Sequence, residues 1–192
     1  MNKIIPKLFL VIALILGIHY FMNNQNQVEE YTDNDLSIQH QFLTVNPYSR
    51  SGKSLNKVKG IVVHYTGNPG TSAKNNRNYF ESLKDKHTTK ASSHFIIGLN
   101  GEIIQCIPLN EIAYASNNRN KDTISIECCH PDKSGRFTNA TYESLQKLVS
   151  SLMKTYSLEK DDIIRHYDVT GKNCPKYFVT YPQKWEEFKD SL

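Results

Sequence analysis

The sequence has no strong charge imbalance, which limits the partners that it is expected to bind. Its 192 residues include 23 Lys and Arg against 19 Asp and Glu, for a formal net charge of +4. This excess suits contact with an anionic polymer but is far below the basic character typical of nucleic-acid-binding domains. No nucleic-acid partner is therefore expected.

The chain also lacks internal repeats and lacks the polar composition of a disordered protein. Apolar residues make up 39% and charged residues 22% of the sequence, which is enough apolar side chain to bury a core. A length of 192 residues accommodates one domain of about 150 residues with an N-terminal extension. We expect a single folded domain and a monomer.

Cysteine is scarce, and its spacing excludes a disulfide framework. The four cysteines are Cys106, Cys128, Cys129 and Cys174, and neither their number nor their spacing is typical of a disulfide scaffold. Two alternatives stay open for the first three. Cys106 pairs with Cys128 or Cys129 if the chain is exported, or these residues are buried free thiols on strands.

Only one long apolar run is present, and it lies at the N-terminus. Lys3 and Lys7 precede an unbroken apolar stretch from Leu8 to Ile18, the pattern of an export signal. The sequence after it lacks a small-x-small cleavage site, so residues 1–22 are expected to form an uncleaved membrane anchor, with a cleaved signal peptide as the alternative. Basic residues stay on the inner side of the membrane, which places the rest of the chain outside.

The anchor or signal is followed by a polar segment and then by the folded domain. Residues 23–42 are rich in Asn, Gln, Glu and Asp with little apolar periodicity, which is typical of a linker. Residues 43–192 are expected to form the domain.

Strands and helices alternate within this domain. Strands are predicted at 60–64, 94–98, 102–107, 123–128 and 163–165, the second and third joined by an Asn-Gly turn. Helices are predicted at 74–86, at 141–156 and around Trp185 and Phe188. This pattern predicts one α/β domain in which helices flank a central mixed sheet.

Three residues at the ends of these elements are candidate metal ligands. His64 ends the first predicted strand, His166 follows the last one, and Cys174 lies eight positions later in a loop. Two imidazoles and a thiolate suit Zn²⁺, and three protein ligands leave a fourth position open for water, as in catalytic zinc sites. Among the other histidines, His130 precedes Pro131 and is expected to be exposed.

Glu127 and Lys172 are the candidates for acid–base and electrostatic roles beside the metal. Glu127 interrupts the apolar strand 124–128, and a carboxylate there is costly unless it is paired or functional. The alternative is a Glu on the solvent face of an alternating strand. Lys172 lies two residues before Cys174, where an ammonium can stabilise a developing oxyanion; the alternative is an ordinary loop lysine.

Four segments, taken together and in order, resemble the zinc-dependent N-acetylmuramoyl-L-alanine amidases. They are KGIVVHYTGNPGTSA, SSHFIIGLNGEIIQCIP, DTISIECCHP and IIRHYDVTGKNCP. This family includes bacteriophage lysozyme-type amidases, Bacillus-type endolysins and animal peptidoglycan recognition proteins. The resemblance covers about residues 43–190.

The resemblance implies a role for each of these positions. His64, His166 and Cys174 match the zinc ligands of the family, Glu127 matches the catalytic glutamate of the Bacillus-type enzymes, and Lys172 matches the lysine of active members. It implies that the chain hydrolyses the amide bond between N-acetylmuramic acid and L-alanine in peptidoglycan. The alternative is a peptidoglycan-binding module of the same fold without turnover, and the presence of Cys174 favours activity.

Two departures from the family pattern and one weaker match concern the substrate cleft. Ser93 stands where lysozyme-type members have a catalytic tyrosine, and Ala115 stands where some endolysins have a histidine. Glu127 would therefore act as the base alone, and one substrate contact would be missing. His94 matches a family position near the cleft, so the resemblance implies a substrate contact there.

Overall fold

The computed structural model describes residues 30–192 of the chain. The predicted anchor or signal at 1–22 and the first part of the predicted linker lie outside the described residues. Over the described range, no helix combines the length and the apolar character needed to cross a membrane.

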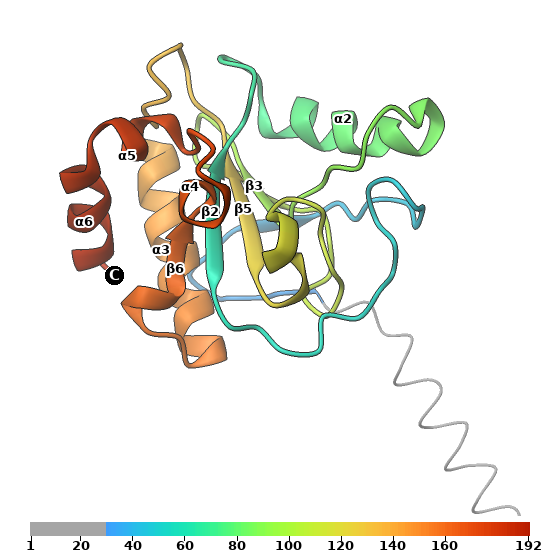
Figure 1. Cartoon of the computed structure of the whole chain (residues 1–192), viewed down its shortest axis with the longest axis horizontal. Coiled ribbons are helices and arrows are strands. Elements are labelled where there is room, and N and C mark those ends of the chain that lie inside the picture. The colour runs from blue at the N-terminus through green and yellow to red at the C-terminus, as the bar shows by residue number, and fades with distance from the viewer. Residues whose placement is uncertain (1–29) are drawn as a thin grey trace, which may run out of the picture.

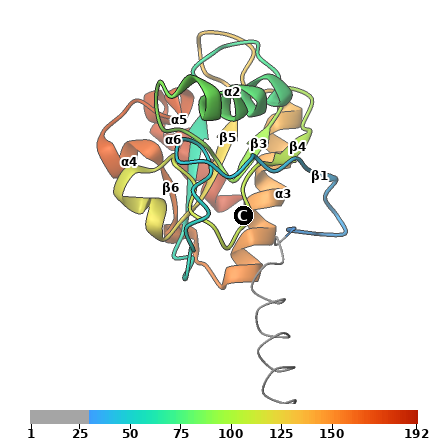
Figure 2. The same cartoon turned by 90° about the vertical axis from the view of Figure 1, so that its right-hand side faces the viewer.

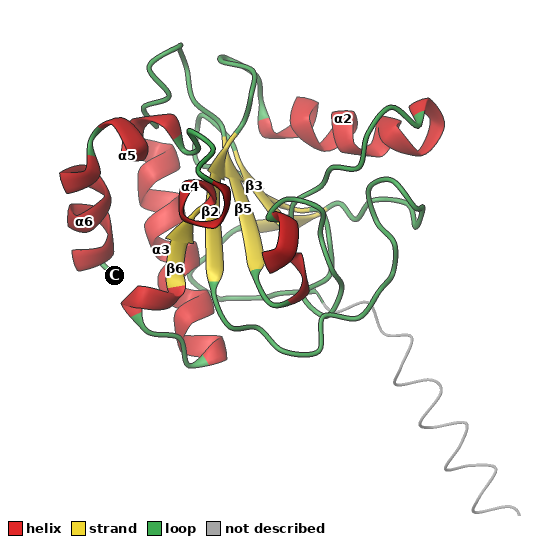
Figure 3. Cartoon of the chain, in the orientation of Figure 1, coloured by secondary structure: helices red, strands yellow, loops and turns green. Residues whose placement is uncertain are grey.

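A six-stranded mixed sheet forms the centre of the molecule (Figures 1 and 3). Its strand order is β1-β4-β3-β5-β2-β6, and only the β3–β4 pair is antiparallel. The strands are β1 (Ile38–His40), β2 (Ile61–Tyr65), β3 (Phe95–Ile97), β4 (Ile103–Gln105), β5 (Ile124–Cys128) and β6 (Ile163–Arg165). The predicted mixed sheet is confirmed, and so is the hairpin, whose turn contains Gly101 at φ +82°.

Helices surround this sheet. They are α2 (Ala73–Lys86), α3 (Asn139–Tyr156), α4 (His166–Thr170), α5 (Lys176–Thr180) and α6 (Pro182–Asp190), with 3-10 turns η1 (Asn117–Lys121) and η2 (Lys160–Asp162). The helices predicted at 74–86 and 141–156 are confirmed within two residues at their N-terminal ends, and the helix predicted around Trp185 and Phe188 is α6. The five-residue helices α4 and α5 were not predicted, because one turn of helix is too short to show a periodic apolar face.

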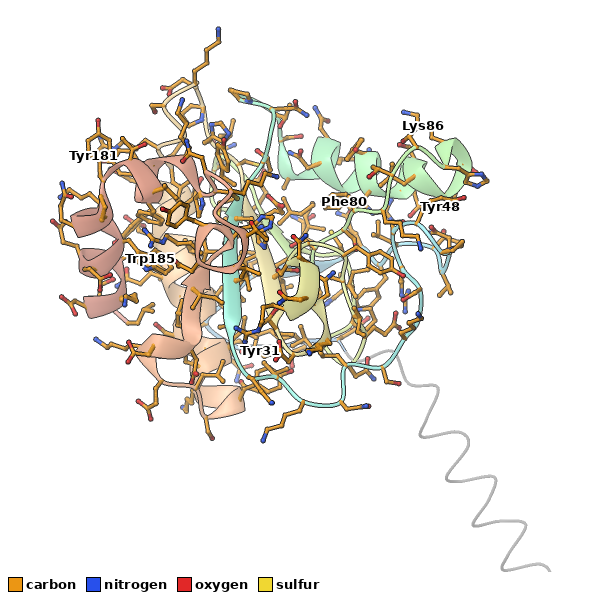
Figure 4. All side chains as sticks on the ribbon, viewed as in Figure 1. Tyr31, Tyr48, Phe80, Lys86, Tyr181 and Trp185 are labelled. Carbon is orange, nitrogen blue, oxygen red and sulfur yellow. The ribbon has the colours of Figure 1, made fainter. Side chains whose placement is uncertain are left out.

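Alternation along the strands divides the core into two layers. Figure 2 shows α3 along one face of the sheet, and Trp185 of α6 is labelled in Figure 4. Ile61, Val63, Ile124 and Ile126 belong to the apolar cluster on that face, together with leucines of α3 and with Trp185 and Phe188 of α6. The opposite face is covered by α2, whose Phe80 is labelled in Figure 4. Phe80 and Leu83 pack with Ile96 and Ile104 on that face. Because successive strand residues alternate in direction, His64 and Glu127 belong to the α2 face.

The helix α3 packs an apolar face against the sheet. Leu145, Leu148, Val149 and Leu152 are all buried at helical spacing, and Thr138 caps the N-terminus by accepting the backbone N–H of Thr141. Truncating one such buried leucine to alanine costs about 2–5 kcal/mol of stability. This helix therefore stabilises the sheet whose opposite face carries His64 and Glu127.

Part of the predicted linker belongs to the sheet. Ile38–His40 form β1 and pair with Ile103–Gln105 of β4, and Tyr31 is buried with its backbone N–H on the Gln105 side chain. The polar composition of this segment gave no apolar pattern from which the strand could be predicted. An edge strand can form with little apolar burial because backbone hydrogen bonds to its neighbour also stabilise it.

Two expectations about single side chains are settled by the structure. All four cysteines are buried free thiols, so Cys106 is not paired with Cys128 or Cys129. The expected exposure of His130 is wrong, because it is buried with its ring nitrogens 2.7 Å from the carbonyl oxygens of Thr66 and Asp132. These two carbonyl partners explain how a polar ring is accommodated in the interior.

Candidate metal centre and catalytic cleft

The register of three parallel strands brings three predicted site residues to one edge of the sheet. His64 of β2 is paired with Glu127 of β5, and Val63 is paired with Arg165 of β6. His166 follows Arg165 directly and is the first residue of α4, so it lies beside His64. The carboxyl ends of adjacent parallel strands are where α/β sheets place their ligand sites.

Cys174 reaches the same point from the loop after α4. Gly171 ends α4 in the left-handed conformation, and the Tyr167 backbone N–H donates to the Cys174 carbonyl at 2.8 Å. The chain thus folds back on the start of the helix. This return places the Cys174 thiol against the two histidines.

His64, His166 and Cys174 form a cluster that can hold a metal ion. One ligand atom from each lies within 4.8 Å of the other two, and all three residues are buried. The two Nδ1 atoms are 3.1 Å apart, and the Cys174 sulfur is 3.9 Å from Nδ1 of His64. A tetrahedral zinc site, with bonds of about 2.0 Å to nitrogen and 2.3 Å to sulfur, sets its ligand atoms about 3.3–3.7 Å apart, so the spacing fits.

Burial sets the protonation of these three groups. It lowers the pKa of His64 well below 6.5, with His166 and Lys172 adding to the effect, and it also lowers the pKa of His166. Both imidazoles are therefore neutral near pH 7 and keep a lone pair for a metal. Burial raises the pKa of Cys174 to about 12. A bound cation would lower this pKa again by stabilising the thiolate.

Glu127 lies next to this cluster with one oxygen lacking a partner. Its Oε1 is 4.0 Å from Nδ1 of His64, while Oε2 is buried and accepts no hydrogen bond from residues 30–192. Burial raises the pKa of Glu127 to about 8, although Lys172 opposes the shift. A buried carboxylate oxygen without a partner is costly in a purely structural role, so its position favours contact with a ligand.

Lys172 is exposed at the rim of the cluster. Its charge acts on His64, His166, Glu127 and Cys174, and the ammonium makes no ion pair within the described part of the chain. The cluster therefore has one cation at its open side that is available to an anion or an oxyanion.

The structure does not bring His94 to the cluster. The residue is 1% exposed, its Nε2 lies 2.9 Å from the Glu111 carbonyl oxygen, and its Nδ1 accepts the Ser125 backbone N–H at 3.0 Å. His94 therefore exposes almost no surface for the substrate contact that the resemblance implies, and both of its ring nitrogens are hydrogen-bonded within the domain.

Two residues that the sequence analysis did not single out contact the histidines directly. Oγ of Ser116 is 3.1 Å from Nε2 of His64, and Oδ1 of Asn117 is 3.0 Å from Nε2 of His166. These contacts join positions 52 and 49 residues apart in the chain. No local pattern reports such a contact, since it depends on how η1 packs against the sheet edge.

Comparison with known proteins identifies relatives that are named as amidases. Residues 54–177 match the family model described as N-acetylmuramoyl-L-alanine amidase. N-acetylmuramoyl-L-alanine amidase BlyA of Bacillus subtilis (strain 168) is 36% identical over 174 residues, which cover 80% of this chain and 46% of BlyA. N-acetylmuramoyl-L-alanine amidase CwlL of Bacillus licheniformis is 37% identical over 164 residues, covering 79% of this chain and 45% of CwlL. The chain thus spans about half the length of these relatives.

Solved structures agree with the sequence comparison. The catalytic domain of XlyA superposes with a TM-score of 0.69 at 26% identity, over 81% of this chain and 99% of that domain. A mutant endolysin from Bacillus subtilis gives a TM-score of 0.67 at 27% identity, over 81% of this chain and 98% of the other. The family match spans most of the domain that carries the cluster, and the chain belongs to the N-acetylmuramoyl-L-alanine amidase family, a family of hydrolases.

Proposed function

We propose that this chain is a zinc-dependent amidase that hydrolyses the amide bond between N-acetylmuramic acid and L-alanine in peptidoglycan. The observation that carries the proposal is the convergence of two neutral imidazoles and one thiol within 4.8 Å, beside a carboxylate oxygen without a partner. Family membership supplies the substrate class, because the matched relatives are named for this activity.

His64, His166 and Cys174 would hold the zinc ion. Once bound, zinc in a site of three protein ligands supplies Lewis-acid polarisation of a carbonyl and lowers the pKa of a water to about 7. The remaining chemistry belongs to residues of the chain.

Glu127 is placed to move the proton of the reaction. In the proposed mechanism its free Oε2 accepts a proton from the attacking water and returns it to the leaving nitrogen of L-alanine. Burial raises the pKa of Glu127 to about 8 and Lys172 opposes the rise; a bound cation would lower it further, toward the neutral range in which a group can both gain and lose a proton. The missing tyrosine at Ser93 leaves this role to Glu127 alone.

Lys172 is placed to stabilise charge. The scissile carbonyl oxygen becomes negative as water adds to its carbon, and an ammonium at the rim of the site lowers the energy of that state. Its exposure leaves the ammonium free to approach substrate.

The substrate determines where the enzyme must act. Peptidoglycan lies outside the cell membrane, so we propose that residues 1–22 export the domain and hold it at the outer face of the membrane, or are removed after export. Mass analysis of the N-terminus of the mature protein separates these two forms.

Digestion of purified cell walls tests the proposed function. The zinc-loaded protein is expected to release intact stem peptides from the glycan, as measured by mass spectrometry, and the metal-free protein and Cys174→Ala are expected to release none. Cys106→Ala is the matched control, since Cys106 is also a buried free thiol but lies outside the cluster. Binding of cell walls without release of peptides would instead identify a non-catalytic binding module.

A further inference from the structure

Side chains at the start of the short turn η1 contact both histidines of the cluster on the ring side that faces away from the centre of the cluster. Ser116 contacts Nε2 of His64 and Asn117 contacts Nε2 of His166. The ring nitrogens on the other side, the two Nδ1 atoms, face each other at 3.1 Å. The position of the protons on the Nε2 atoms therefore decides what the Nδ1 atoms offer to a cation.

Asn117 fixes the proton on His166. Its Oδ1 is an acceptor only, so the hydrogen bond at 3.0 Å requires Nε2 of His166 to carry the hydrogen. A metal-binding imidazole is neutral and carries one hydrogen, and this contact places that hydrogen on Nε2. Nδ1 of His166 therefore presents a lone pair to the centre of the cluster.

Ser116 serves His64 in either of its neutral forms, because a hydroxyl can donate or accept. With the hydrogen of His64 on Nδ1, this N–H donates to Nδ1 of His166 and the serine hydroxyl donates to Nε2. With the hydrogen on Nε2, the serine oxygen accepts it and the Nδ1 lone pair is free for a metal. Ser116 is fully buried, so water cannot take over this role.

The turn that carries both residues is itself held in place. Oδ1 of Asn120 accepts the backbone N–H groups of Ala115 and Ser116 at 3.0 and 2.5 Å, and the Arg119 N–H donates to the Ser116 carbonyl at 2.9 Å. Asn117 adopts φ +53°, a conformation that Asn tolerates better than most residues. The two oxygens are thus fixed relative to the sheet edge before any metal arrives.

We propose that Ser116 and Asn117 are positioning residues for the metal: by accepting the Nε2 hydrogens of His64 and His166, they turn both Nδ1 lone pairs toward one cation. This inference rests on the proposed zinc site and adds two residues behind the ligands. Hydrogen-bond partners of metal-bound histidines typically change metal affinity by about 10–100-fold when removed.

Zinc affinity of the purified protein tests the inference, measured with Zn²⁺ alone by competition against a chromophoric chelator. Ser116→Ala is expected to weaken binding by close to 100-fold, because the buried Nε2–H loses its partner. Asn117→Gly keeps the positive φ but removes the oxygen, and is expected to weaken binding about tenfold, since water can replace an exposed acceptor.

Two further variants separate positioning from simple destabilisation. Asn117→Asp keeps the acceptor and is expected to bind zinc within about threefold of the parent, and Asn118→Gly, the same change at the next exposed residue, is expected to do the same. Denaturant unfolding of the metal-free proteins gives a second readout. A purely structural role would lower the unfolding free energy and leave zinc affinity unchanged.

The outcomes distinguish this inference from the proposed function. Weaker zinc binding by Ser116→Ala and Asn117→Gly, with recovery in Asn117→Asp, supports it. If the parent binds zinc and cleaves cell walls while both variants match its affinity, the inference fails and the proposed function stands. If the parent binds no zinc, both fail together. Should Ser116→Ala not fold, the exposed Asn117 variants decide the question.

Discussion

Two histidine sites lie along one face of β5, and their difference separates structure from function. His94 contacts Ser125 near the N-terminal end of the strand, and His64 lies beside Glu127 near its C-terminal end. Both residues are 1% exposed. Burial alone therefore says nothing about function.

The contrast is in how the polar atoms are satisfied. Both nitrogens of His94 have partners within the domain, one of them a backbone carbonyl. At the other site the Nδ1 atoms of His64 and His166 face each other, and Oε2 of Glu127 has no partner over residues 30–192. The polar atoms of the first site are satisfied without a ligand, whereas the second leaves an oxygen of Glu127 unsatisfied, and in the proposed function a cation and a water complete it.

The comparison predicts its largest effect at Glu127. Glu127→Gln keeps the shape of the side chain but cannot accept a proton, so turnover of muropeptides is expected to fall about 10²–10⁴-fold while zinc still binds. Steady-state kinetics and metal analysis of the same sample check both parts. Glu143→Gln, the same change on the exposed side of α3, is the control. Near-parental turnover in Glu127→Gln would remove Glu127 from the mechanism.

The next effect is a pH dependence that belongs to His94. Burial lowers its pKa from 6.5 to about 4, whereas the unfolded chain titrates near its usual value. Above pH 6.5 both states are neutral and the contribution to stability is complete. As the pH falls from 6.5 to 4 the unfolded chain binds a proton that the folded chain does not, so about 3 kcal/mol of stability is lost.

Urea unfolding of the metal-free protein at pH 7 and near pH 4 measures this loss. His94→Gln retains an amide that can accept the Ser125 N–H and donate to the Glu111 carbonyl but does not titrate, so it provides the reference. The parent is expected to lose about 3 kcal/mol more than this variant over the range. Equal losses in the two proteins would show that His94 titrates normally in the folded state.

The smallest effect is expected at Ser125. Its hydroxyl lies 3.0 Å from Nδ1 of His94, a nitrogen that the Ser125 backbone N–H also serves, and it accepts the His94 backbone N–H at 3.2 Å. Because Ser125→Ala leaves that backbone N–H without its partner, it is expected to lower the unfolding free energy by about 2 kcal/mol and to leave zinc affinity unchanged. A fall in zinc affinity would join the two histidine sites into one network and contradict the comparison.

Regular patterns made the scaffold predictable from the sequence. The β-branched run before His64 predicts a strand, the Asn-Gly turn predicts a hairpin, and the apolar spacing of α3 predicts a helix. Because strand ends meet at one side of a sheet, residues at those ends are expected to share a cleft. His64, His166 and Cys174 were found as a set because of their placement at such ends. The structure places their ligand atoms within 4.8 Å.

Features that depend on long-range contacts were missed. The β1 strand is polar and is defined by its pairing with β4, and His130 is buried because two carbonyl groups surround its ring. Ser116 and Asn117 gain their importance only when η1 meets the edge of the sheet. In each case the information lies in a contact between distant segments, which no local periodicity carries.

The most direct test of the central claim is the anomalous diffraction of crystals grown with zinc. One peak is expected between Nδ1 of His64, Nδ1 of His166 and the sulfur of Cys174, with a water or substrate atom as the fourth ligand. A peak enclosed by four protein atoms, or zinc bound elsewhere with these three side chains vacant, would contradict the account.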